Sequence, residues 1–190
     1  MSVMCDWEIK KAIESGNLLI DPFDETLINP ASLDFRLGSK FTFTEVTGKV
    51  KANLNGKTVS VIDPKNKDSF KDITIETDEF VLAPGQSILT CSLETFDFLS
   101  LTDGIACEVK GKSSLGRIFI ANSPVAGWVD PGFKGVLTLE LSNLSDKHVK
   151  LTAGMKIGQL ILHKISRPSL DYKRTGRYNS QSEAAGSLGV

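Results

Sequence analysis

Apolar and polar residues alternate along much of this chain, a pattern that is typical of β-strands with one buried face. It is clearest in residues 31–38, where every second side chain is large and apolar. The residues between them are Ser32, Asp34 and Arg36. This polar row predicts either a solvated face or the lining of an interface between subunits, and the pattern alone leaves both open.

Shorter stretches of the same kind continue as far as residue 165. Besides an extended segment at 17–23, they predict strands at 41–43, 59–61, 73–76, 80–82, 87–93, 105–110, 136–143, 148–151 and 156–165. One helix is predicted at residues 7–15, with Asp6 as its cap and Gly16 as its stop. Many short strands with one short N-terminal helix predict an all-β, mainly antiparallel domain of barrel or sandwich type.

The totals narrow the class of protein. A length of 190 residues fits one domain with a real core, and a net charge of −1 gives no overall field that would attract nucleic acid or a membrane. No apolar run reaches the ~20 residues of a membrane helix, and MSVMCDWEIKK is not followed by the apolar segment of a signal peptide. Three scattered cysteines predict neither a disulfide framework nor a zinc knuckle. We expect a cytoplasmic protein without nucleic-acid or membrane partners.

The last part of the chain differs from the rest in composition. Residues 168–190 are rich in Ser, Gly, Arg and Tyr and cannot form a core by themselves. The chain therefore divides into a β domain at 1–167 and a C-terminal arm at 168–190. The arm is either a frayed terminus or a segment that orders over a ligand, and its tyrosines, arginines and glutamine favour the second.

Residues 108–140 carry the most concentrated chemistry. They include the run KSSLGR at 112–117, in which hydroxyls, loop amides and an arginine could all donate to phosphate oxygens. Neither a Walker A motif nor a dinucleotide-binding glycine motif is present. From the residues alone, this run is either a phosphate-binding turn or an ordinary surface loop.

Two carboxylates follow that run. Asp130 begins an Asp-Pro-Gly turn, where it could bind a sugar hydroxyl or a water. Glu140 is an isolated charge in an apolar strand, either exposed to solvent or placed in a pocket where burial would raise its pKa and suit it to acid–base catalysis. The zinc deaminase signature is absent, and His148 and His163 lack metal spacing. Any chemistry is therefore expected to use carboxylates, hydroxyls, arginine and a ligand-borne magnesium ion, without zinc.

Taken together, the motifs resemble those of the dCTP deaminases of the trimeric dUTPase superfamily. In chain order they are IDPFDETLINPASLDFRLG, VKGKSSLGR, AGWVDPGFKGVLTLELSN, GMKIGQL and RYNSQ. The resemblance covers nearly the whole chain, and the order and spacing of the motifs make it specific. It implies a β-clip fold, a dUTPase-like distorted barrel, assembled as a homotrimer with active sites between subunits.

The resemblance also implies a nucleotide site, residue by residue. Glu140 would activate water against the amine-bearing carbon of cytosine, and Ser113 and Arg117 would orient that water and the substrate. Asp130 completes the catalytic set. The implied nucleotide contacts are Lys112, Ser113, Ser114, Leu115, Gly116, Arg117, Ala126, Asp130, Thr138, Leu139, Glu140, Gln159, Tyr172, Arg177 and Gln181. The arm would close over a triphosphate whose Mg²⁺ is held mainly by phosphate oxygens. Arg177 stands where the family often has lysine, so the contact at that position stays open.

The same resemblance bears on the product. Bifunctional members release ammonia from dCTP and then diphosphate, giving dUMP for thymidylate synthesis, and Gly127 and Trp128 after Ala126 look like theirs. In those members the position matching Asp130 is thought to orient the water that cleaves between the α- and β-phosphates. A deaminase that stops at dUTP, a plain dUTP diphosphatase and a non-enzymatic nucleotide sensor remain alternatives. The resemblance implies dTTP as a feedback inhibitor.

Overall fold

The computed structural model of the chain describes residues 2–99, 104–122, 126–166, 168–170, 172–184 and 186–188. Most of the strands among them form one eleven-stranded sheet. Its main path runs β11 (Ile120–Asn122), β13 (Lys134–Asn143), β9 (Ser87–Phe98), β4 (Ser32–Val46), β15 (Lys156–Ile165), β10 (Gly104–Gly111), β12 (Trp128–Val129). The strands beside this path are β1 (Ser2–Val3), β2 (Leu18–Asp21), β3 (Ile28–Asn29) and β7 (Phe70–Glu76). The pairs along the path and beside it are antiparallel, so the predicted all-β, mainly antiparallel fold is confirmed.

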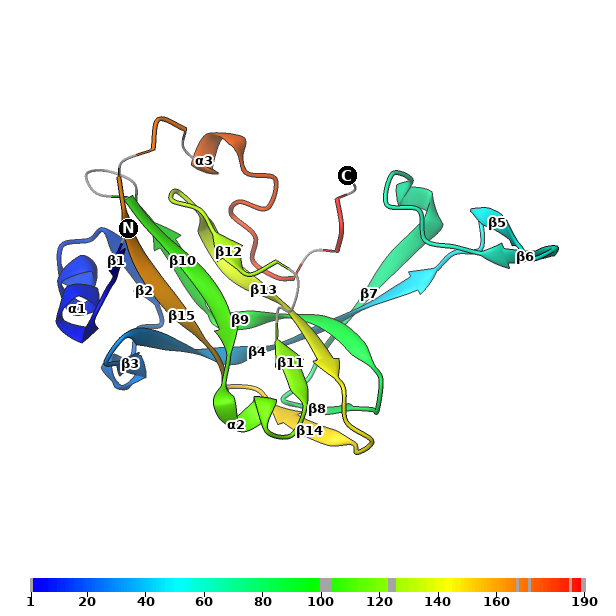
Figure 1. The fold of residues 1–190 in the computed structure, drawn as a ribbon, viewed down its shortest axis with the longest axis horizontal. Helices are drawn as coiled ribbons and strands as arrows, with labels where there is room; N and C mark the ends of the chain where they lie inside the picture. The colour runs from blue at the N-terminus through cyan, green and yellow to red at the C-terminus, as the bar shows by residue number, and fades with distance from the viewer. Residues whose placement is uncertain are drawn as a thin grey trace.

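The smaller elements lie around this sheet (Figure 1). Two strand pairs stand apart from it, β8 (Glu79–Leu82) with β14 (Val149–Thr152) and β5 (Lys51–Leu54) with β6 (Lys57–Ser60). The helices are α1 (Asp6–Glu14), α2 (Ser113–Gly116) and α3 (Tyr172–Thr175), with 3₁₀ turns η1 (Glu25–Leu27) and η2 (Lys67–Ser69). The β5–β6 hairpin projects beyond the end of the β4–β7 ribbon, and α2 and α3 lie at opposite ends of the molecule. Among the described residues, none of the helices has the length and apolarity needed to cross a membrane.

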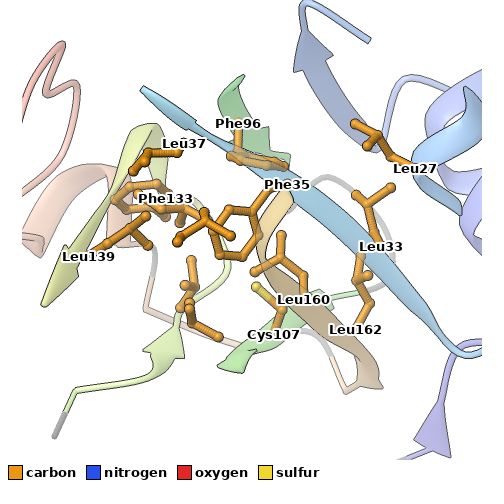
Figure 2. Packing of buried hydrophobic residues seen from close by; sticks show 14 of the residues in the cluster. Leu27, Leu33, Phe35, Leu37, Phe96, Cys107, Phe133, Leu139, Leu160 and Leu162 are labelled. Atoms are coloured by element: carbon orange, nitrogen blue, oxygen red, sulfur yellow. The ribbon is translucent and has the colours of Figure 1, made fainter. Parts of the chain in front are cut away.

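The core lies where β4 crosses β9 and β15. Leu33, Phe35 and Leu37, from the apolar row predicted on this strand, are at most 1% exposed and point into one cluster of side chains (Figure 2). A Cβ atom at Gly158, on the neighbouring strand, would collide with the ring of Phe35. The alternation of β4 and a glycine on β15 therefore fix how these two strands pack.

The predicted N-terminal helix is present as α1, but its cap differs from the prediction. Cys5, and not Asp6, occupies the capping position, because Glu8 accepts a hydrogen bond at 3.0 Å from the Cys5 backbone N–H. A glutamate three residues beyond the cap commonly bonds back in this way. The chain leaves the helix at Gly16, which has a φ of +74°, as the predicted stop requires.

The polar row of β4 is not the solvated face that alternation allowed. Ser32 and Asp34 are 8% and 2% exposed. The Asp34 carboxylate lies 2.8 Å from the Lys112 ammonium and 3.4 Å from that of Lys156. The Ser32 hydroxyl donates to the side-chain carbonyl of Gln159 at 3.1 Å. Within this chain, the start of the row is therefore an internal polar cluster rather than a water-facing surface.

Other differences concern short elements. The polar segment that follows β4 was expected to hold one short strand near residues 59–61, and it forms the β5–β6 hairpin. The run at 112–117 folds as the single turn α2 and its flanks. Cys91 and Cys107 are buried and free of disulfides, and burial raises the pKa of both thiols. Residue 167, the predicted end of the β domain, lies outside the described residues.

Candidate active site

A cavity of about 700 Å³ opens between β13, the segment around β12 and the C-terminal arm. Its lining mixes apolar side chains with polar and aromatic ones. The polar and aromatic residues include Trp128, Asp130, Thr138, Glu140, Tyr172, Tyr178 and Gln181, and Ala126 also lines it. A concave site with a small number of polar groups is where small ligands usually bind.

Strand β13 supplies the central carboxylate. Alternation along this strand turns Thr138 and Glu140 toward the cavity, while Leu139 between them is fully buried in the core (Figure 2). Glu140 is partly exposed, and its carboxylate forms no hydrogen bond or ion pair with any other described residue. An acid without a partner at the wall of a cavity is free to exchange a proton with a bound molecule.

The second carboxylate stands on the turn that precedes β13. The Asp130 carbonyl accepts from the Phe133 N–H at 3.2 Å, and the Gly132 N–H donates to the Phe98 carbonyl at 2.8 Å. Gly132 has a φ of +89°, a conformation that glycine adopts without strain. The Asp130 side chain accepts a hydrogen bond at 3.0 Å from the indole N–H of Trp128. The turn thus presents this carboxylate at the rim of the cavity.

The arm is attached to the domain at two places. The Tyr172 N–H donates to the Pro131 carbonyl at 3.2 Å, and the ring of Tyr172 lies 6.0 Å from that of Phe133. Further along, the side-chain amide of Gln181 donates to the Val136 carbonyl and to the Thr138 hydroxyl, both at 2.9 Å. These contacts lay the arm along one side of the cavity.

Gly135 makes the second attachment possible. It has a φ of +135°, and a Cβ atom on it would lie 2.8 Å from the Gln181 carbonyl oxygen. At this attachment the side-chain oxygen of Gln181 is buried and has no hydrogen-bond partner among the described residues. Buried acceptors are normally satisfied, so this oxygen is open to a donor from a ligand or a water.

The basic run at 112–117 lies elsewhere. Lys112 is paired with Asp34, Leu115 is buried, and the remaining residues of the run are exposed on α2 or beside it. None of residues 112–117 lines the cavity. Figure 1 shows α2 at the far end of the molecule from α3. The half of the predicted site that would hold phosphates is therefore separate, in one chain, from the half that holds Glu140.

The predicted site residues thus fall into two sets. The cavity of one chain brings together Ala126, Asp130, Thr138, Glu140, Tyr172 and Gln181. The residues that do not line it are Lys112, Ser113, Ser114, Leu115, Gly116, Arg117, Leu139, Gln159 and Arg177. Sequence reasoning missed Asp34, which holds Lys112, because its charge read as part of an ordinary polar row. The hydrogen bond from Trp128 to Asp130 had no signal in the sequence.

Comparison with known proteins adds a family to this geometry. Residues 3–165 match the family model described as dCTP deaminase-like. A dUMP-forming dCTP deaminase of Methanoculleus marisnigri is 37% identical over 186 residues, covering 96% of this chain and 92% of the relative. One from Corynebacterium efficiens is 40% identical over 170 residues, covering 88% and 81%.

A solved structure supports the fold. The crystal structure of 2'-deoxycytidine 5'-triphosphate deaminase from Agrobacterium tumefaciens superposes with a TM-score of 0.59 at 21% identity. The match covers 86% of this chain and 48% of that one, so the present chain spans about half of its length. At this identity the likeness concerns the fold.

Proposed function

The chain belongs to the dCTP deaminase-like family, and we propose that it converts dCTP to dUMP by releasing first ammonia and then diphosphate. The observation that carries this proposal is the Glu140 carboxylate, which has no partner among the described residues and lines the same cavity as Asp130 and the arm. The names of the two relatives add weight, because each covers most of this chain at 37–40% identity.

In the first step, Glu140 acts as both base and acid. It takes a proton from water as the water oxygen attacks the amine-bearing carbon of cytosine, and it returns a proton to the departing amine, which leaves as ammonia. The exocyclic C–N bond breaks, and a C=O bond takes its place. Acid–base exchange at one carboxylate suits a residue that makes no competing ion pair.

In the second step, Asp130 orients a water toward the bond between the α- and β-phosphates. The turn at 130–132 fixes the Asp130 backbone, and its carboxylate stands at the rim of the cavity rather than beside Glu140 on β13. Two carboxylates on different elements allow two reactions on one bound nucleotide. The arm, through Tyr172 and Gln181, would cover the ligand.

We also propose a homotrimer with active sites shared between copies. A triphosphate bound beside Glu140 would need cations, and the basic turn of the same chain lies outside that cavity. The exposed Arg117 of a neighbouring copy could supply one, and Ser113 of that copy could donate a hydroxyl hydrogen bond. Lys112, Gln159 and Arg177 would be the further contacts of the complete site.

Magnesium would enter with the nucleotide. In the part of the chain that the structure describes, no three His, Cys, Asp or Glu side chains cluster as a metal site would require. A Mg²⁺ ion would therefore take most of its ligands from phosphate oxygens and water, as it does with other nucleoside triphosphates. Its role is to neutralise phosphate charge.

Regulation and location are further parts of the proposal. dTTP would occupy the same cavity without being deaminated, because its base has no exocyclic amine to lose, and so would act as a feedback inhibitor. The three cysteines, all free thiols, fit a reducing compartment and support a cytoplasmic location.

One experiment tests the central proposal. The protein is incubated with dCTP and Mg²⁺, and ammonia, dUTP, dUMP and diphosphate are resolved over time. We expect ammonia, dUMP and diphosphate in equal amounts, with little free dUTP. Accumulation of dUTP equal to the ammonia would indicate a deaminase that stops at dUTP. Hydrolysis of added dUTP without ammonia from dCTP would indicate a plain dUTP diphosphatase, and the absence of both products would refute the proposal.

A further inference from the structure

The side chain of Trp128 contacts residues of neighbouring strands on one side and the Asp130 carboxylate on the other. Trp128 lies on β12, opposite Glu108 of β10 in the strand register. Trp128 and its buried neighbour Val129 both line the cavity, and the indole is 49% exposed. From there its N–H donates to Asp130 at 3.0 Å.

The position of the indole is stabilised by the ring of a buried histidine. Its ring lies 5.9 Å from the ring of His163, a residue of β15 that is 6% exposed. The Nε2 atom of His163 is 3.1 Å from a carboxylate oxygen of Glu108, which also pairs with Lys110. The hydrogen bond from Lys110, together with His163, lowers the pKa of Glu108, so this support keeps its negative charge at neutral pH.

The backbone beneath the indole is held as well. The Val109 N–H donates to the Gly127 carbonyl at 2.6 Å, just before Trp128. The indole is thus fixed by its strand on one side and by the His163 ring on another. Asp130, by contrast, is exposed on a turn, and its carboxylate makes no other hydrogen bond or ion pair with a described residue. Without Trp128, this carboxylate would rotate among several rotamers.

We infer that Trp128 is a positioning residue for the diphosphate-releasing step: its indole N–H fixes one oxygen of Asp130 and leaves the other to orient water. This inference rests on the proposed function, in which Asp130 serves the second reaction. Because Glu140 on β13 serves the first, loss of the indole N–H should affect the two reactions unequally. That inequality separates positioning from a general structural role.

The test compares Trp128→Phe with Trp7→Phe. Both remove an indole N–H and keep an aromatic ring, and Trp7 lies on α1, 61% exposed and outside the cavity. In Trp128→Phe we expect the ratio of dUTP to dUMP released from dCTP to rise about tenfold, as loss of a hydrogen bond to a charged group allows. The ratio in Trp7→Phe should match the wild type. An equal decline of ammonia and diphosphate release in Trp128→Phe would overturn the inference.

A double variant shows whether Trp128 acts through Asp130. If it does, Trp128→Phe combined with Asp130→Asn releases diphosphate no more slowly than Asp130→Asn alone. If instead the two losses multiply, Trp128 works independently of Asp130 and the inference fails.

A measurement without turnover keeps this result distinct from the proposed function. The two indole N–H resonances are recorded by NMR, and Trp7→Phe assigns them. Asp130→Asn should shift the Trp128 resonance and leave that of Trp7 in place, and an unmoved Trp128 resonance would remove the hydrogen bond on which the inference depends. A wild-type protein that makes no dUMP, with the NMR shift present, would instead refute the proposed second reaction and this role with it.

Discussion

The cavity around Glu140 and the basic turn at 112–117 are built in opposite ways. At the cavity, Glu140 and the side-chain oxygen of Gln181 have no partner among the described residues. At the basic turn, Lys112 is already neutralised by the buried carboxylate of Asp34, and α2 beside it is displayed on the surface. The cavity thus presents polar groups that have no partner in the described part of the chain, whereas the basic turn is held by an internal ion pair and faces outward. This difference is consistent with the proposed site shared between copies.

The largest effect on activity is expected from a substitution in the cavity. Glu140→Gln removes the acid–base group while keeping its shape, and we expect ammonia release to fall about a thousandfold with dCTP binding retained. Single-turnover ammonia assays and calorimetric binding would measure the two quantities. Glu79→Gln, an exposed change at the Lys150 pair, serves as a matched control and should have no effect. Near-normal turnover in Glu140→Gln would remove this residue from the mechanism.

A mixing experiment tests whether the two regions work in one chain or across two. Glu140→Gln and Arg117→Ala, each inactive alone, are coexpressed with different tags and purified as mixed oligomers. If sites are shared, an intact Glu140 meets an intact Arg117 at about one contact in four under random assembly, so about a quarter of wild-type activity should return. Activity no greater than the sum of the two variants would mean that each chain holds a complete site.

A smaller effect on activity is expected when the ion pair that holds Lys112 at the basic turn is removed. Asp34→Asn leaves Lys112 and Lys156 without their carboxylate, so the KM for dCTP should rise about tenfold with a lesser change in kcat. Because Asp34 is 2% exposed but its lysines reach solvent, we expect a loss of about 2 kcal/mol in unfolding free energy. Kinetics and urea denaturation would check both. Asp146→Asn, at an exposed pair with Lys147, is the control. An unchanged KM would mean that the ion pair of Asp34 does not contribute to nucleotide binding.

The smallest effect is expected on stability at acid pH, from Glu8 of α1, which lies neither in the cavity nor at the basic turn. The hydrogen bond from Lys164, followed by that from the Cys5 N–H, lowers the pKa of Glu8 to about 2 from a usual 4.5. A lowered pKa means that the stabilisation is complete above about pH 4.5 and is lost as the pH falls toward 2. Glu8→Gln should therefore flatten the acid side of the stability curve and leave dCTP turnover unchanged. The same acid slope in both proteins would contradict this.

The two regions also differ in how far the sequence predicts them. Period-two alternation correctly places most of the longer strands and the core residues of β4, because both depend on local geometry. The same alternation left open what surrounds Ser32 and Asp34, since it says which residues share a face and not what covers that face. The residue that pairs with Asp34 is Lys112, which is 78 residues away in the sequence. Glu140 could be suspected as an isolated charge in an apolar strand, and its role, like those of the other predicted contacts, stays a prediction.

Strand β4 has a consequence for how this protein is made. It carries Asp34 near its start and Thr42 and Thr44, which line the cavity, further along, so both halves depend on one strand. Its partners arrive at different times: Thr42 meets Thr74 of β7, 32 residues away, whereas Ser32 bonds to Gln159, 127 residues away. On the ribosome, the second half of β4 can therefore pair early, while its first half waits for β15, and pairings this distant form slowly. Until β15 emerges, the start of β4 keeps one edge to which another strand could add.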